Sequence, residues 1–216
     1  MSRVAIIGGH GKVALHLSRI LTGAGHEVSS IVRNPDHQED VKATGAQPVV
    51  ADVTKLSSGE LADVVRGHDS VVWSAGAAGS SPEDTYAIDR DAAIRSMDAA
   101  REAGVDRYVM VSYIGARRDH GVPESNSFFH YAEAKAAADE YLRGTDLAWT
   151  ILGPGALTTD PGKGTIEVSG EPQQNSVPRE DVAQVAAVAL GNPRTVGKFI
   201  QFNSGETPIA EALEVV

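Results

Sequence analysis

The chain has 216 residues, of which 42% are hydrophobic and 22% are charged, as is ordinary for one globular domain. Its formal net charge of −10 argues against a nucleic-acid partner, which lysines and arginines would have to bind through phosphates. No apolar run approaches the roughly 20 residues that span a bilayer, no signal-peptide pattern is present, and there is no cysteine. We therefore expect a cytoplasmic monomer or homodimer with a small-molecule substrate and no membrane, nucleic-acid or metal site.

Short apolar runs alternate with helical patterns along the whole chain. The apolar runs predict strands at residues 4–7, 27–32, 47–51, 70–75, 107–112, 148–152 and 198–202. Helices are predicted at residues 12–24, 36–43, 58–66, 83–103, 128–143, 180–191 and 208–215. Near-continuous apolar strands separated by helices are typical of βαβ units, in which helices cover both faces of a parallel sheet. The expected fold class is α/β, with a doubly wound parallel sheet.

We expect residues 1–216 to form a single domain, because no linker, repeat or low-complexity tract divides the chain. The longest irregular regions are 113–127 and 153–178, both rich in Gly, Pro, Ser and Asp. Long loops after late strands tend to overhang the ligand crevice of such a sheet. Region 153–178 is therefore predicted to be a loop-built lid on the substrate side, braced by Arg179.

A glycine-rich loop joins the first predicted strand to the first predicted helix. Its glycines and a small residue give the pattern G-x-x-G-x-x-A, with Gly8, Gly11 and Ala14. The first glycine permits a tight turn, the second lets a pyrophosphate approach the backbone, and the helix N-terminus offers N–H donors to it. The alternative is a plain turn. At a strand–helix junction of a βαβ chain, the pattern favours a dinucleotide site of Rossmann type, with contacts at Gly8, Gly9, His10, Gly11, Lys12 and Val13.

The residue after the second predicted strand indicates which dinucleotide is bound. Binders of NAD usually carry Asp or Glu there, whereas this chain has Arg33, whose planar side chain suits a 2′-phosphate. With Lys12 adding charge, NADP is predicted over NAD, although both cations could instead be solvated surface residues. Further contacts are expected after the third and fourth strands, at Asp52, Val53, Ala75, Gly76 and Ala77. Asp52 could accept a hydrogen bond from adenine or could cap the next turn.

Tyr131 and Lys135 lie four residues apart in the predicted helix 128–143, so they share one face. A lysine cation beside a phenol is expected to lower the tyrosine pKa, and the same lysine can hold ribose hydroxyls. Ser112 ends the fifth predicted strand, at the carboxyl edge where ligands bind, and could polarise a substrate carbonyl. Each feature alone is common, but together with a nucleotide fold they predict a catalytic site.

The ordered set of these segments resembles a known family over nearly the whole chain. The segments are "GGHGKVA", "VRNPD", "ADVT", "SAGA", "AGVDRYVMVSYIGA", "YAEAKAAADEYLRGTDLAWTILGPG" and "PREDVAQVAAVAL". They are similar to those of the atypical short-chain dehydrogenase/reductases, the small NAD(P)-binding group also described as NmrA-like or NAD-dependent epimerase/dehydratase-like.

The resemblance implies a Rossmann fold, NADP binding and a Ser–Tyr–Lys site at Ser112, Tyr131 and Lys135. The family's fourth position, often Asn, aligns with Asp89. Relatives usually read R-P-G after the sixth strand, where this chain has Gly153-Pro154-Gly155. A bulky sugar-nucleotide site is not expected, because few residues follow that strand.

The sequence thus predicts an NADP-dependent reductase of a small carbonyl or quinone-like substrate. One alternative is an NADP-binding redox sensor of NmrA type that has no turnover. Another is a flavin- or biliverdin-type reductase, in which Tyr131 would be dispensable.

Overall fold

The computed structural model describes residues 1–77, 81–169 and 175–216. Its strands are β1 (Arg3–Ile7), β2 (Glu27–Val32), β3 (Gln47–Val50), β4 (Ser70–Trp73), β5 (Arg107–Val111), β6 (Ala148–Pro154), β7 (Ala156–Thr158), β8 (Thr165–Val168), β9 (Ser176–Pro178), β10 (Lys198–Ser204) and β11 (Thr207–Pro208). Its helices are α1 (Lys12–Gly23), α2 (Gln38–Lys42), α3 (Ser58–Val65), α4 (Pro82–Thr85), α5 (Ala93–Ala103), α6 (Phe129–Arg143), α7 (Arg179–Gly191) and α8 (Ile209–Ala212). Two 3₁₀ turns, η1 (Pro35–His37) and η3 (Pro193–Thr195), and a π-helical segment, η2 (Tyr86–Ala92), complete the set.

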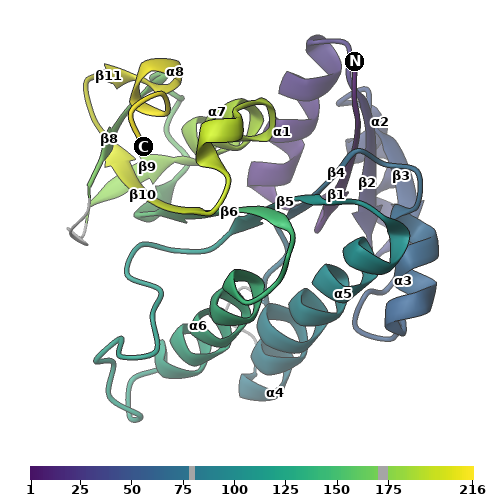
Figure 1. The fold of residues 1–216 in the computed structure, drawn as a ribbon, viewed down its shortest axis with the longest axis horizontal. Helices are drawn as coiled ribbons and strands as arrows, with labels where there is room; N and C mark the ends of the chain where they lie inside the picture. Colours follow the sequence, from purple (N-terminus) through teal and green to yellow (C-terminus); the bar gives the residue numbers. More distant parts are fainter. Residues whose placement is uncertain (78–80, 170–174) are drawn as a thin grey trace.

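A nine-stranded sheet in the order β11-β8-β10-β6-β5-β4-β1-β2-β3 forms the centre of the molecule. The seven strands from β10 to β3 in this order are parallel, whereas β8 pairs antiparallel with β10 and β11. Helices α1 and α7 cover one face, and α3, α5 and α6 cover the other (Figure 1). The doubly wound α/β prediction is confirmed, and all seven predicted strands are present.

Each face of the sheet has its own hydrophobic core. On one side α1 buries Val13, Leu17 and Leu21, one stripe of an amphipathic helix, against α7. On the other side the apolar strand β4, which is buried along its whole length, packs toward the α5–α6 layer through Trp73. Burial on both faces explains why the strands are almost continuously apolar. In the described part of the chain, no helix combines the length and apolarity that a membrane crossing requires.

Two predicted segments differ from the structure. The lid region 153–178 was expected to be irregular, but it contains β7, β8 and β9, and β7 pairs with β9 in a separate two-stranded sheet. These strands have only three or four residues, too few for a periodic sequence signal. Residues 170–174 of this region lie outside the described residues.

The predicted helix 83–103 consists of three consecutive pieces, α4, η2 and α5. Because η2 is π-helical, its side chains do not follow the directions that a regular α-helix would give them.

The strand order reverses at β1, which lies between β2 and β4. The loops that follow β1 and β4 meet there, at the point where ligands bind to open α/β sheets. Gly8 has φ +85°, and a Cβ at this position would lie 2.5 Å from the backbone nitrogen of Ala75. Gly8 is therefore required both by its backbone conformation and by the contact between the two loops.

A pair of glycine substitutions separates these two requirements. Gly25 has φ +83°, but no atom lies within 4 Å of the Cβ that would be added. We expect Gly25→Ala to lower the free energy of unfolding by about 1–2 kcal/mol, from the left-handed conformation alone. Gly8→Ala should cost about 1–3 kcal/mol more, because Ala75 must also move. Urea denaturation of both variants measures this, and equal losses would show that the contact with Ala75 is not restrictive.

Candidate active site

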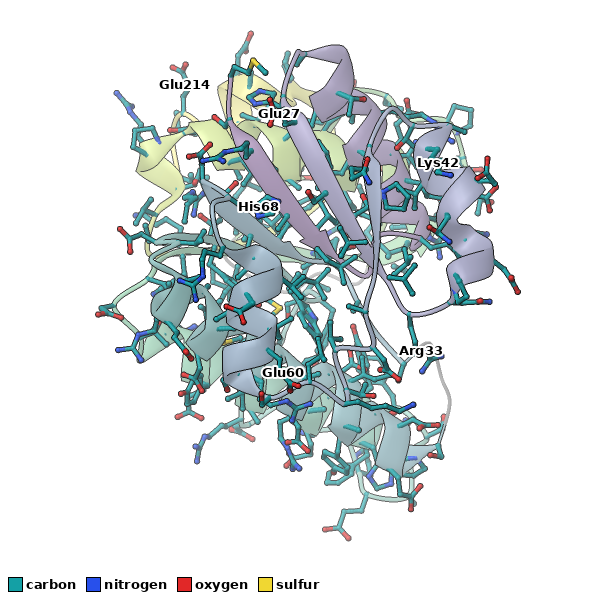
Figure 2. All side chains as sticks on the ribbon, turned by 90° about the vertical axis from the view of Figure 1, so that its right-hand side faces the viewer. Glu27, Arg33, Lys42, Glu60, His68 and Glu214 are labelled. Carbon is teal, nitrogen blue, oxygen red and sulfur yellow. The ribbon has the colours of Figure 1, made fainter. Side chains whose placement is uncertain are left out.

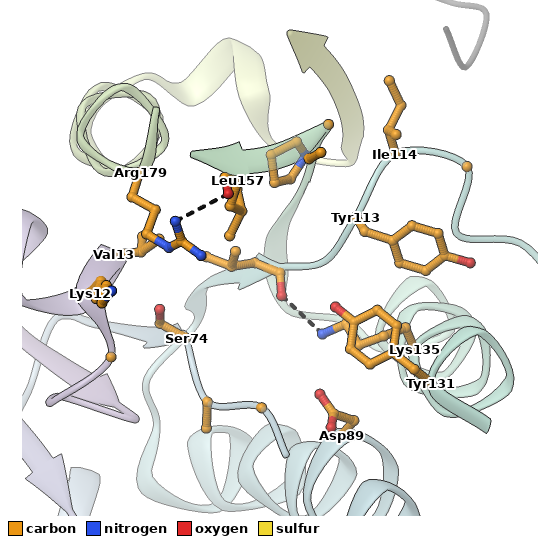
Figure 3. Close-up of a pocket in the computed structure, with 18 of the residues that line it drawn as sticks. Lys12, Val13, Ser74, Asp89, Tyr113, Ile114, Tyr131, Lys135, Leu157 and Arg179 are labelled. Atoms are coloured by element: carbon orange, nitrogen blue, oxygen red, sulfur yellow. Dashed lines mark hydrogen bonds between the residues drawn. The ribbon is translucent and has the colours of Figure 1, made fainter. Parts of the chain in front are cut away.

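A cavity of about 860 Å³ opens at the carboxyl edge of the sheet, beside the reversal of strand order (Figure 3). Its walls come from the glycine-rich loop and α1, the ends of β4, β5 and β6, η2, α6, and the β7–β9 region. The lining residues are Gly11, Lys12, Val13, Ser74, Ala75, Gly76, Asp89, Val111, Tyr113, Ile114, Gly115, Phe128, Tyr131, Lys135, Pro154, Gly155, Ala156, Leu157, Asn175 and Arg179.

The N-terminus of α1 faces this cavity and fits a diphosphate. Gly11 is the N-cap, no side chain caps the helix, and its first turn has no acidic residue. The backbone N–H groups of the first turn and the positive end of the helix dipole are therefore available to an anion. A Cβ on Gly11 would lie 3.2 Å from the carbonyl oxygen of Gly8 and 3.5 Å from that of Ser74. The loop is thus a narrow cradle that larger side chains would fill.

The structure divides the predicted cofactor contacts into two groups. Those that line the cavity are Gly11, Lys12, Val13, Ala75, Gly76 and Lys135. Those outside its lining are Gly8, Gly9, His10, Arg33, Asp52, Val53 and Ala77. The second group follows β1, β2, β3 and β4 at the same edge of the sheet. Residues 78–80, which follow the predicted contacts Ala75, Gly76 and Ala77, lie outside the described residues.

Arg33 lies immediately beyond β2 and is exposed (Figure 2). No ion-pair partner is found for it among the residues that the structure describes. His10, in the glycine-rich loop, stacks on His37 with ring centroids 3.5 Å apart, and its Nε2 lies 2.9 Å from Oδ2 of Asp40. His10 therefore joins the glycine-rich loop to η1 and α2, the segment that follows Arg33.

Asp52 shows the capping role that the sequence left open. Its Oδ1 accepts hydrogen bonds from the backbone N–H of Thr54 at 3.1 Å and from the Thr54 hydroxyl at 2.7 Å. Burial alone would raise the pKa of Asp52, but these bonds and Lys55, whose Nζ is 3.3 Å away, lower it. Contact with an adenine stays a prediction. Val53 packs against the apolar cluster of α3 and α5.

Lys135 is buried, with 1% of its surface exposed, and its side chain reaches back to the end of β5. The ammonium donates a hydrogen bond of 2.9 Å to the carbonyl oxygen of Val111 (Figure 3). Two buried carboxyl groups, Asp89 and Asp139, act on this charge. The helix face that carries Lys135 also carries Tyr131, so the structure brings together the predicted Tyr–Lys pair on the cavity wall.

Tyr131 belongs to a cluster of three aromatic rings. Its ring centroid lies 5.5 Å from that of Tyr113 and 5.2 Å from that of Phe128. The expectation that Lys135 would lower its pKa is wrong for this arrangement. Burial, with the negative charges of Asp89 and Asp139, raises the pKa of Tyr131 above its ordinary value. The phenol is therefore protonated at neutral pH, as a proton donor must be.

Ser112 does not line the cavity. Its side chain is directed toward Asp139 of α6 instead. The hydroxyl donates a hydrogen bond of 2.6 Å to Oδ2 of Asp139, and both residues are buried. The prediction that Ser112 polarises a substrate carbonyl therefore does not fit this geometry.

Asp89 is on the cavity wall, in the middle of η2, with 1% of its surface exposed. Its Oδ2 accepts a 2.9 Å hydrogen bond from the backbone N–H of Ala77, and burial raises its pKa. Figure 3 shows its carboxyl group directed toward Tyr131 and Lys135. The sequence left the role of this residue open, and the structure makes it part of the site.

The lid side of the cavity is held by Arg179, as predicted. At the start of α7, its Nη1 donates a 3.1 Å hydrogen bond to the carbonyl oxygen of Leu157 in β7. A Cβ on Gly155 would collide with Asn203 and with the Asn175 carbonyl. The segment after β6 is therefore packed tightly against β10 and the residues just before β9.

Two residues of the site are not predicted by the sequence patterns above. Asp139 follows Lys135 by four positions and Tyr131 by eight, so helical periodicity places it on the same face. Tyr113 follows Ser112 directly, beyond the end of β5, and lines the cavity next to Tyr131. Burial raises the pKa of Tyr113 to about 12.

Comparison with known proteins identifies the family. Residues 8–193 match the family described as NAD(P)H-binding. This chain belongs to that family. This match fits the resemblance of its sequence motifs to the atypical short-chain dehydrogenase/reductases, a group also described as NAD-dependent epimerase/dehydratase-like.

Several relatives match over almost their whole length. The chain is 32% identical over 214 residues to a Bacillus subtilis protein named as an uncharacterized sugar epimerase, YhfK, covering 98% of this chain and 99% of that protein. A putative NAD-dependent epimerase/dehydratase from Bacillus halodurans has a similar structure, with a TM-score of 0.92, 32% identity and complete coverage of both chains. The oxidoreductase ylbE from Lactococcus lactis aligns with a TM-score of 0.89 and 28% identity, over 99% of this chain and 96% of that one.

A substitution in the glycine-rich loop tests the cradle. We expect Gly11→Val to abolish binding of NADPH and NADH, because the added side chain would occupy space next to the helix N-terminus. Gly23→Ala, at the other end of α1 and in open space, should leave binding unchanged. Nucleotide fluorescence measures the affinity and circular dichroism the fold. Unchanged affinity in folded Gly11→Val would mean that the glycines serve only the turn.

Proposed function

We propose that this protein is an NADP-dependent reductase of a small carbonyl or quinone-like substrate. The observation that carries the proposal is that Tyr131 and Lys135 lie on the wall of a mostly apolar cavity that the N-terminus of α1 also faces. When bound, NADPH would supply the hydride for reduction of a substrate carbon. Residues of this chain would bind the cofactor, hold its ribose and donate the proton.

Each residue would have a distinct part. Gly11 and the first turn of α1 would bind the diphosphate, and Arg33 the 2′-phosphate. Lys135 would hold the ribose hydroxyls and keep its charge near the reacting oxygen. Tyr131 would donate its proton to the substrate oxygen as hydride arrives at the carbon. Ser112, tied to Asp139, would support the end of β5 without contacting the substrate.

The lining supports a flat, mostly apolar substrate. Tyr113, Phe128 and Tyr131 form one aromatic wall, and Val111, Ile114 and Leu157 extend the apolar surface. Such rings favour stacking with conjugated rings at centroid separations of about 4.5–7 Å. Phe128 lines the cavity and is 41% exposed, so part of this aromatic wall is accessible from solvent. A conjugated ketone or quinone would use this wall, with its oxygen toward Tyr131.

Cofactor preference should depend on Arg33. We expect NADPH to bind more tightly than NADH, and Arg33→Ala to lose most of that difference. A charge-assisted contact is worth roughly 1.5–3 kcal/mol, or about ten- to hundredfold in affinity. Arg66→Ala, which removes an exposed arginine paired with Asp63, is the control and should change nothing. Calorimetric titration with both nucleotides measures the preference. A wild-type protein without preference would contradict the NADP assignment.

Removing one hydroxyl tests the proton donor. With a substrate found by screening quinones, ketones and aldehydes for NADPH oxidation, Tyr131→Phe should lower kcat/KM by about 10²–10⁴-fold. NADPH affinity should stay nearly constant, because the ring remains. Tyr141→Phe is a matched control on the same helix, since its hydroxyl donates to Asp98 outside the cavity.

The other outcomes would identify the alternatives. A flavin- or biliverdin-type reductase would keep most of its rate in Tyr131→Phe. A redox sensor would bind NADPH in both proteins and turn over no substrate of the panel.

A further inference from the structure

A second cavity, of about 420 Å³, adjoins the first on the lid side. One wall is a stripe of α1 that carries Lys12, His16 and Arg19, whose spacing of four and three residues places them on one face of the helix. The opposite wall is the segment 158–161, which follows β7. Lys12 and Arg179 line both cavities, so the two spaces meet at these side chains.

The lining of the second cavity gathers positive charge on a chain that is acidic overall. It holds three permanent cations, Lys12, Arg19 and Arg179, against two carboxylates, Asp160 and Glu180. That balance is one net positive charge, whereas the whole chain has a formal net charge of −10. The sign of the lining therefore favours an anionic ligand.

The cations of α1 are not used by the fold. In the part of the chain that the structure describes, no ion pair involves Lys12, His16 or Arg19. Other arginines at helix surfaces, such as Arg66 and Arg101, pair with nearby aspartates. The cations of the second cavity can thus bind a carboxylate without first giving up a partner.

The wall opposite α1 is anchored by the first turn of α7. Oε2 of Glu180 accepts a 2.9 Å hydrogen bond from the backbone N–H of Gly162. The buried carboxylate of Asp181 accepts hydrogen bonds from the N–H groups of Lys163 at 3.0 Å and Gly164 at 2.8 Å. At its other end this wall continues into β7, which pairs with β9 directly before α7. The second cavity is therefore built by the fold, and the Glu180 carboxylate is already bonded to the loop.

The position of this cavity favours the substrate over the nucleotide as its occupant. In the proposed function the nucleotide runs from the start of α1 toward Arg33, after β2. The lid-side strands β8 and β10 lie on the other side of β1 from β2. Figure 3 shows Lys12 and Arg179 across the first cavity from Tyr131. A substrate with its oxygen at Tyr131 can therefore extend past these two cations into the second cavity.

We infer that the second cavity binds a carboxylate at the far end of the substrate, which makes the substrate an acidic conjugated carbonyl compound. The inference rests on the proposed reductase function. One net positive charge in the lining matches a singly charged carboxylate better than a doubly charged phosphate. Lys12 and Arg19 are seven residues apart, or about 10 Å along α1, which sets the reach of the acidic tail. The hydroxyls of Thr158 and Thr159 line the same cavity and can donate hydrogen bonds to it.

Matched probes test the carboxylate site without turnover. The probes are naphthoquinones whose alkyl chain ends in a carboxylate, in its methyl ester or in a phosphate. Calorimetry at low salt, with NADP⁺ present, should show the acid binding roughly tenfold more tightly than the ester. Arg19→Gln should lower affinity for the acid by about fivefold and leave that for the ester unchanged. Arg66→Gln, at an exposed ion pair with Asp63, is the control and should change neither affinity.

Equal affinities for acid and ester, or a preference that survives Arg19→Gln, would overturn the site. Tighter binding of the phosphate would overturn its assignment to a carboxylate. Wild-type protein gives a second measurement if the variant does not fold. The NMR signals of the His16 ring should move when the acid is added and stay in place with the ester, and signals that the acid does not move would also overturn the site.

The same probes separate this site from the proposed function. If the acid binds at His16 but no NADPH is oxidised, the reductase function fails and the carboxylate site stands. If the ester is reduced and the acid has no advantage in binding, the site fails and the reductase function stands. If NADP⁺ does not bind, the proposed function fails, and the comparison of acid with ester on the free protein still decides the site.

Discussion

The buried ammonium of Lys135 is the interaction on which the site depends. Its hydrogen bond to the Val111 carbonyl joins α6 to the end of β5. Its positive charge stabilises the ionised carboxyl groups of Asp89 and Asp139. Without the Lys135 ammonium, the negative charge of Asp89 and Asp139 would be buried with no positive charge beside it. Removing the partner of a buried charge typically lowers the free energy of unfolding by several kcal/mol. The same contact fixes the helix face that directs Tyr131 into the cavity. Stability and the proposed chemistry therefore rest on one side chain.

The second requirement is the close approach of the two loops at the reversal of strand order. Gly8 allows the turn after β1 to lie against Ala75 after β4, which leaves the N-terminus of α1 open toward the cavity. The glycine-rich loop and the Tyr–Lys helix are far apart in sequence and reach the same edge because the sheet is parallel. The lid completes the opposite wall through the bond from Arg179 to Leu157. These walls leave an apolar surface on which the proposed conjugated substrate would stack.

Much of this was predictable from the sequence, for clear physical reasons. Parallel strands buried on both faces require apolar runs, and a strand–helix turn at a phosphate requires glycines, so the fold and the loop were predictable. The orientation of Ser112 was not predictable. Neighbouring residues at the end of β5 differ in their surroundings: Tyr113 lines the cavity, whereas Ser112 is bonded to the buried Asp139. The pKa of Tyr131 was also not predictable, since it depends on carboxyl groups brought in by η2 and by a later turn of α6. Periodicity signals do not include π-helical segments or three-residue strands, which is why η2, β7 and β9 were missed.

The proposed function requires a nicotinamide dinucleotide to lie across this edge with its reactive ring beside Tyr131. A crystal structure of the protein with NADP⁺ tests this most directly. We expect the diphosphate to lie on the N–H groups at the start of α1, the 2′-phosphate on Arg33, and the nicotinamide in the cavity between Tyr131 and Leu157. A nucleotide bound in the reverse direction, or a nicotinamide ring outside the cavity, would contradict it.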